Sequence, residues 1–153
     1  MTTAATHDSF VIERTYKASP ERVFAAWTDP AQKRAWFVEG EGWTILSYEA
    51  DIRTGGVERS RFRFEDGPEM TNTTFHHVIE PNRRLVASYD MTLAGKPFSV
   101  SLSTLELIPD GDGTRLVLTE QAAFFEGADG VANRQRGCEE LLGKLAEALG
   151  EQS

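Results

Sequence analysis

Residues 19–37, SPERVFAAWTDPAQKRAWF, decide the fold class, because they predict two short helices in immediate succession. Serine, proline and glutamate at 19–21 are typical of a helix start, where serine caps the first amides, proline suits the first position and glutamate suits the positive end. Asp29–Gln32 repeats the signal, with the glutamine placed for a capping box, and predicts a second helix to about Trp36. Apolar side chains in the first helix recur at helical spacing at Val23, Phe24 and Trp27.

The chain on either side of this pair is typical of β-strands and one long helix. Short breaks rich in Gly, Pro, Asn and Asp separate the strands, and short links favour antiparallel pairing of neighbours as a meander. A helix is expected over Gly127–Leu149, ended by Gly150. The expected strands are Phe10–Tyr16, Trp43–Ile52, Val57–Phe64, Thr71–Ile79, Leu85–Leu93, Phe98–Ile108 and Thr114–Phe124.

This order predicts an α+β fold in which a seven-stranded curved antiparallel sheet wraps the long terminal helix, the only element large enough to cover its inner face. The helix is plainly apolar in its second half, whereas Arg134 and Gln135 interrupt the apolar side in its first half. We therefore expect a solid core at one end and a polar-lined cavity at the other. The whole forms one domain over residues 9–150, preceded by a flexible tail over residues 1–8.

Composition excludes several classes of protein. The chain has 153 residues, a net charge of −8 and a single cysteine, Cys138. One cysteine allows neither an intrachain disulfide nor a four-cysteine zinc site and suits the reducing cytosol, so we expect a cytoplasmic protein. The acidity disfavours nucleic acid, and no apolar run approaches the roughly 20 residues of a membrane span, so neither is an expected partner. Residues 1–9 lack the basic and apolar regions of a signal peptide.

Four motifs, in this order and spacing, resemble the heat shock protein 90 ATPase activator-like family of the START-like (SRPBCC) superfamily. They are the run at residues 19–30, the aromatic pair Trp36-Phe37, the hairpin DIRTGG at 51–56 and GTRL at 113–116. The resemblance covers residues 9–150. It implies a helix-grip (START/Bet v 1-like) fold, which holds a ligand cavity between sheet and helix.

Two positions depart from that family. Many members carry Gly-Trp where this chain has Gly137-Cys138, and many place an aromatic residue where this chain has Glu58. If both positions face the cavity, as the resemblance implies, the cavity differs in volume and polarity from those of its relatives. The superfamily includes lipid carriers, polyketide cyclases, toxin-sequestering proteins and chaperone activators, and fold alone does not choose among them. The eukaryotic chaperone activators have an additional N-terminal domain for which this chain has no room, so a chaperone partner is not favoured.

Candidate ligand-binding residues come from the aromatic cluster and from the inner face of the sheet. Ligand pockets are mostly apolar and aromatic, but ordinary packing of the short helices is the alternative for the cluster. On three strands one face changes from aliphatic to small or polar, as from Leu105 to Ser99, although a one-residue slip would turn these side chains outward. The expected set is Trp27, Trp36, Phe37, Trp43, Glu58, Phe62, Phe75, Tyr89, Ser101, Ser103, Glu120, Gln135 and Cys138.

Catalytic candidates are few. Glu58 and Glu120 are the carboxylates considered for acid–base chemistry, with Tyr89 as a donor, and the alternative for both is an ion pair or plain exposure. His76 and His77 are adjacent on a strand and point to opposite faces, so they cannot share a metal. No nucleotide or dinucleotide motif is present, and we expect neither a metal nor a cofactor.

These features favour the binding of a small hydrophobic or amphipathic molecule in an internal cavity. Two alternatives stay open: a polyketide cyclase or dehydratase-like enzyme acting on an aromatic substrate, and a module that interacts with an Hsp90-type chaperone. A homodimer is left open as well.

Overall fold

The computed structural model describes residues 5–125 and 130–151. The helical elements are α1 (Pro20–Thr28), α2 (Pro30–Lys33), the π-helical turn η1 (Arg34–Val38) and α3 (Val131–Ala148). Residues 127–129 of the predicted terminal helix lie outside the described residues. The strands are β1 (Thr6–Tyr16), β2 (Trp43–Ala50), β3 (Val57–Phe64), β4 (Met70–Glu80), β5 (Arg84–Leu93), β6 (Lys96–Asp110) and β7 (Gly113–Phe124).

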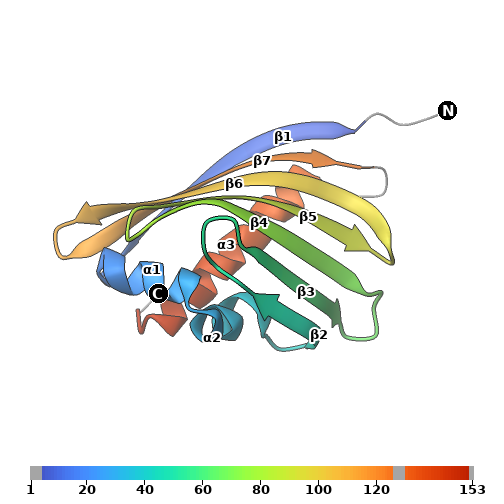
Figure 1. The fold of residues 1–153 in the computed structure, drawn as a ribbon, viewed down its shortest axis with the longest axis horizontal. Helices are drawn as coiled ribbons and strands as arrows, with labels where there is room; N and C mark the ends of the chain where they lie inside the picture. The colour runs from blue at the N-terminus through green and yellow to red at the C-terminus, as the bar shows by residue number, and fades with distance from the viewer. Residues whose placement is uncertain (1–4, 126–129, 152–153) are drawn as a thin grey trace.

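The predicted fold class is confirmed. All seven strands form one antiparallel sheet in the order β1-β7-β6-β5-β4-β3-β2, so β2 to β7 make the expected meander and β1 adds to β7. Figure 1 shows the sheet arching over α3, with α1 and α2 below one end of the sheet. Every strand boundary lies within two residues of its predicted position, except the start of β1.

The prediction of a flexible tail up to residue 8 is wrong for residues 6–8. Strand β1 begins at Thr6, which pairs with Phe124 at the far end of β7. Without residues 6–8, the edge of β7 at this end would have main-chain amide and carbonyl groups without partners. Residues 6–8 supply these partners. Their side chains are polar and exposed, so the sequence carried no apolar signal of a strand.

Local capping explains the two short helices. The Ser19 side chain accepts a hydrogen bond from the amide of Arg22, and Asp29 accepts one from the amide of Ala31. Gln32 Nε2 donates to the carboxylate of Asp29. The glutamine does not accept from the main-chain amide of Asp29, as a capping box would require, because that amide donates to the carbonyl of Ala25 and closes α1. The second helix does not stop near Trp36 but continues through η1 to Val38.

The solid end of the core lies under the second half of α3. Leu142 and Leu145 are fully buried there, together with Leu116 of β7 and Val23 of α1. The Tyr16 hydroxyl donates to the carbonyl of Leu142 at 3.0 Å and so joins β1 to α3. The predicted division of the helix into a core half and a more polar half is therefore correct.

A close main-chain approach in the β2–β3 hairpin requires glycine at residue 56. A Cβ atom there would lie 1.9 Å from the carbonyl oxygen of Asp51, so the turn would have to shift. We expect Gly56→Ala to lower the free energy of unfolding by about 1–3 kcal/mol, as overpacking commonly does. Urea unfolding measures this loss. Gly137→Ala is the control, because a Cβ at this helical position meets no atom within 4 Å. Equal stabilities of the two variants would contradict the steric argument.

Candidate functional site

A cavity of about 440 Å³ lies between the inner face of the sheet, the first half of α3 and the α2–η1 segment. Strand alternation places every second side chain of β3 to β7 on this inner face. The cavity is mainly apolar and aromatic, and charged side chains stand near two parts of its wall. The apolar lining residues are Trp27, Phe37, Val38, Trp43, Phe62, Met70, Leu85, Ala87, Met91, Phe98, Leu105, Leu118, Phe124, Leu141 and Leu142.

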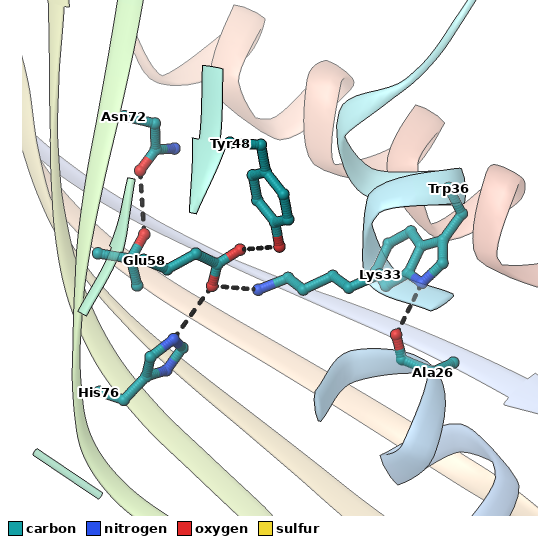
Figure 2. Close-up of polar contacts among 8 residues, drawn as sticks. Ala26, Lys33, Trp36, Tyr48, Glu58, Asn72 and His76 are labelled. Carbon is teal, nitrogen blue, oxygen red and sulfur yellow. Dashed lines mark hydrogen bonds and ion pairs between the residues drawn. The ribbon is translucent and has the colours of Figure 1, made fainter. Parts of the chain in front are cut away.

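One charged group of the wall is an ion pair between α2 and β3. Lys33 Nζ lies 2.9 Å from Glu58 Oε1, and the two side chains are 6% and 5% exposed. His76 Nε2 lies 3.0 Å from the same carboxylate oxygen, and the Tyr48 hydroxyl donates to Oε2 at 2.8 Å. Figure 2 shows Lys33, His76 and Tyr48 converging on Glu58 from three elements. Lys33 and His76 border the cavity, whereas Glu58 stands behind them.

This arrangement keeps Glu58 ionised. Burial by itself would raise the pKa of its carboxyl group, but the charge of Lys33 and the hydrogen bonds from His76, Lys33 and Tyr48 outweigh burial and lower the pKa to about 2. Burial, followed by the charge of the same carboxylate, raises the pKa of Tyr48. A carboxylate with this pKa and three donors is a structural anion and a poor general base or acid near neutral pH.

The low pKa predicts how stability depends on pH. The folded-state pKa lies below the ordinary value of 4.5, so the stabilisation is complete above pH 4.5 and is lost as the pH falls towards 2. We expect the stability advantage of the wild type over Glu58→Gln to shrink by about 2 kcal/mol between pH 6 and pH 3. Urea unfolding of both proteins across this range measures the difference, in which contributions from other carboxyl groups cancel. An advantage that does not change with pH would contradict a depressed pKa.

The second charged group of the wall joins α3 to β5 and β7. Arg134 Nη1 donates to the Tyr89 hydroxyl at 3.0 Å, and that hydroxyl donates to Glu120 Oε1 at 2.5 Å. Burial raises the pKa of Glu120, and the hydrogen bond from Tyr89 and the charge of Arg134 only partly offset this effect. Burial, followed by the charge of Glu120, also raises the pKa of the Cys138 thiol, so this cysteine is a neutral wall residue.

Eight of the thirteen expected ligand-binding residues line the cavity. They come from α1, η1, five strands and α3. The predicted inward-facing positions on β5, β6 and β7 are correct and bring their residues together. Whether they contact a ligand stays a prediction. The eight are Trp27, Phe37, Trp43, Phe62, Tyr89, Ser103, Glu120 and Cys138.

Five expected residues do not line the cavity. Trp36 is buried in the core, where its indole donates to the carbonyl of Ala26, and Glu58 is covered by Lys33. Ser101 faces inward but is covered by the Arg134 guanidinium, which donates to its hydroxyl at 2.9 Å. Gln135 lies on α3 beside the residues that line the wall and is not one of them. Phe75 is 40% exposed and lies on the outer face, because its neighbour His76 faces inward.

Lys33, His76 and Arg134 are wall residues that the sequence did not indicate as site residues. Charged side chains on short helices are usually solvated, so the default interpretation of Lys33 is surface. The interruption of the apolar side of the last helix at Arg134 was the one available signal. Buried polar atoms without a hydrogen-bond partner among the described residues are Trp27 Nε1 and His76 Nδ1, both on side chains of the cavity wall.

Within residues 5–125 and 130–151, no group of three or more His, Cys, Asp and Glu side chains is placed to hold a metal ion. In the same part of the chain, no helix is long and apolar enough to cross a membrane.

The curved sheet that grips a long helix around an apolar cavity defines a helix-grip domain of the START-like class. The sequence model of the family described as "Activator of Hsp90 ATPase homolog 1-like protein" matches residues 17–150. The chain therefore belongs to this family, as the four motifs predicted. No curated protein matches the sequence.

Solved structures of bacterial proteins share the fold. A search found Mll3558 from Rhizobium loti at 45% identity and a TM-score of 0.89, over 95% of this chain and 99% of that one. A protein from Rhizobium leguminosarum is 37% identical with a TM-score of 0.91, over 96% and 97% of the two chains. CalU16 from Micromonospora echinospora is 27% identical with a TM-score of 0.64, over 94% and 83%.

Proposed function

We propose that the protein binds a small, largely apolar molecule with at least one polar group in the cavity between its sheet and α3. The observation that carries this proposal is the cavity itself. Its volume of about 440 Å³ is within the usual range for small-molecule sites, and its wall is mainly apolar with a few convergent polar groups. The unpartnered polar atoms of Trp27 and His76 add two groups that a polar ligand atom would satisfy after a small side-chain adjustment.

A thermal-shift screen tests the proposal, with fatty acids, flavonoids, polyketides, sterols and aromatic metabolites as the panel. A ligand at 100 times its dissociation constant adds about 2.7 kcal/mol to the free energy of unfolding. For a chain of this size that corresponds to a rise in melting temperature of roughly 5–10 °C. A reproducible rise with one chemical class supports the proposal. No rise in melting temperature with any compound counts against the proposal and favours interaction with an Hsp90-type chaperone. A pull-down assay for that chaperone would then test the interaction.

A second candidate function, cyclase or dehydratase-like chemistry, rests on Glu120. Its raised pKa and its contact with the Tyr89 hydroxyl suit a proton donor or acceptor at the wall of an apolar cavity. Glu58 does not serve as the second carboxylate, because its pKa is about 2 and Lys33 covers it. Turnover of a ligand found in the screen, abolished in Glu120→Gln while binding persists, would support catalysis. Binding without turnover would support a carrier or sensor.

A further inference from the structure

The guanidinium of Arg134 is a cation in the cavity wall that contacts only neutral groups among the described residues. Nη1 donates to the hydroxyls of Tyr89 and Ser101, at 3.0 and 2.9 Å, and Nη2 donates to the hydroxyl of Ser99 at 2.6 Å. Its centre lies 5.4 Å, 5.8 Å and 5.2 Å from the ring centroids of Tyr89, Phe98 and Phe124. Hydroxyls and aromatic faces hold the side chain in place and provide no full negative charge.

Lys33, the buried cation of the wall, differs from the half-buried Arg134 in this respect. Lys33 lies 2.9 Å from the carboxylate of Glu58, so its charge is already matched. Arg134 has no carboxylate within ion-pair distance in the described part of the chain, and its contact with Glu120 runs through the Tyr89 hydroxyl. Of these two positions, Arg134 is the one at which an anion would find an unmatched charge. A third cation of the wall, Lys144 on α3, also has no ion pair among the described residues, so it is the competing position that the variants must separate from Arg134.

The N–H groups of the Arg134 guanidinium that remain available also favour an anion as the partner. A guanidinium has five N–H groups, and the contacts with Tyr89, Ser101 and Ser99 use three of them. One donor on Nε and one on Nη2 remain for partners outside the described contacts. These two nitrogens share one edge of the group, and such an edge binds a carboxylate or a similar oxyanion with two parallel hydrogen bonds. The guanidinium is half-buried between three aromatic rings, and surroundings of lower polarity than water strengthen a charge-assisted hydrogen bond.

We infer that Arg134 is an anion-recognition residue and that the ligand is an acidic amphipath, with an apolar body in the cavity and a carboxylate or other oxyanion on the guanidinium. This inference rests on the proposed function and narrows it to a ligand class. Glu120 accepts a hydrogen bond from the Tyr89 hydroxyl that Arg134 also contacts, so it lies close enough to oppose a bound anion whenever its carboxyl group is ionised.

Two fluorescent probes with the same ring system test the inference. 8-Anilinonaphthalene-1-sulfonate carries an oxyanion, and N-phenyl-1-naphthylamine lacks it. We expect Arg134→Gln to weaken binding of the sulfonate probe about tenfold or more, the range of a hydrogen bond between charged groups, and to change the affinity for the neutral probe less than twofold. Arg134→Lys keeps the positive charge but loses the paired N–H groups of the guanidinium. Its affinity for the sulfonate probe should lie between those of the wild type and Arg134→Gln.

Matched variants separate local recognition from net charge. Arg136→Gln removes one positive charge from an exposed position of the same helix, where Arg136 contacts Asn133, and should leave both affinities unchanged. Glu120→Gln should raise the affinity for the sulfonate probe several-fold, a gain that a purely structural role of this wall would not produce. This variant also keeps the inference testable if Arg134→Gln does not fold.

The outcomes distinguish the two proposals. If the wild type binds the neutral probe but Arg134→Gln and Arg136→Gln bind the sulfonate equally well, anion recognition is overturned and the cavity proposal stands. A loss confined to Lys144→Gln would place the anion beside Gly40, where the Lys144 amino group lies, and would also overturn the inference. If neither probe binds the wild type, both proposals are contradicted.

Discussion

Replacing Glu58 by alanine is expected to lower the free energy of unfolding by about 3–5 kcal/mol, the usual cost of removing one partner of a buried ion pair. The Lys33 ammonium would remain in a site that is only 6% exposed, with no other carboxylate of the described residues within 4 Å. Its contacts with the faces of Phe37 and Trp27, 4.6 and 5.7 Å from the ring centroids, are too weak to replace an ion pair. Urea unfolding at pH 7 measures the loss.

Glu69→Ala is the matched control for this prediction. Glu69 forms an ion pair of 2.7 Å with Arg61, but both side chains are largely exposed, so we expect a much smaller loss of stability than for Glu58→Ala. The double variant Glu58→Leu with Lys33→Met should recover most of the loss, because it leaves no unpaired charge in the core. Similar stabilities of Glu58→Ala and Glu69→Ala would show that the pair is not buried as described.

The second large effect is expected from Gly137→Phe. Gly137 lies in the wall of the cavity on α3, and a Cβ atom at this position would meet no atom within 4 Å outside the adjacent backbone of its own helix. An aromatic ring at this position would take up part of the 440 Å³ that the ligand is proposed to occupy. We expect the affinity for N-phenyl-1-naphthylamine to fall by at least about tenfold, while stability changes little because glycine is a poor helix residue.

Gly143→Phe provides the control for this variant. Gly143 also lies in α3 and has open space around a built Cβ, but it is exposed and is not part of the cavity wall. The same glycine-to-phenylalanine change there should leave probe affinity unaltered. Equal effects of the two variants on affinity, or none from Gly137→Phe, would argue against binding in this cavity.

Much of the fold was predictable because its signals are local. The capped starts at Ser19 and Asp29 and the glycine-containing turns set element boundaries, and short links fixed antiparallel neighbours. Alternation on β6 and β7 then predicted that Ser103 and Glu120 face inward beside Leu105 and Leu118. These inferences need only the two-residue alternation of a strand and one buried residue that shows which of the two faces points inward.

The site was less predictable for two reasons. Its contacts join residues far apart in the sequence, and some of its inward-facing side chains are polar while apolar neighbours face outward. On β4 the inner face carries Asn72, Thr74 and His76, whereas the apolar Phe75 lies outside. The register of β4 also shifts between His76 and Val78, so one regular alternation of inward- and outward-facing residues does not describe the whole strand. Lys33 and Glu58 are 25 residues apart, and no spacing rule connects a cation on a short helix with an anion on a distant strand.

The most direct test of cavity binding is a titration of the ¹⁵N-labelled protein with N-phenyl-1-naphthylamine, followed by the chemical shifts of the main-chain amides. The account predicts saturable shifts at wall residues such as Ser103, Leu118 and Cys138. Shifts concentrated at Val100 and Leu102, which are exposed on the outer face, would contradict it, as would the absence of saturable shifts.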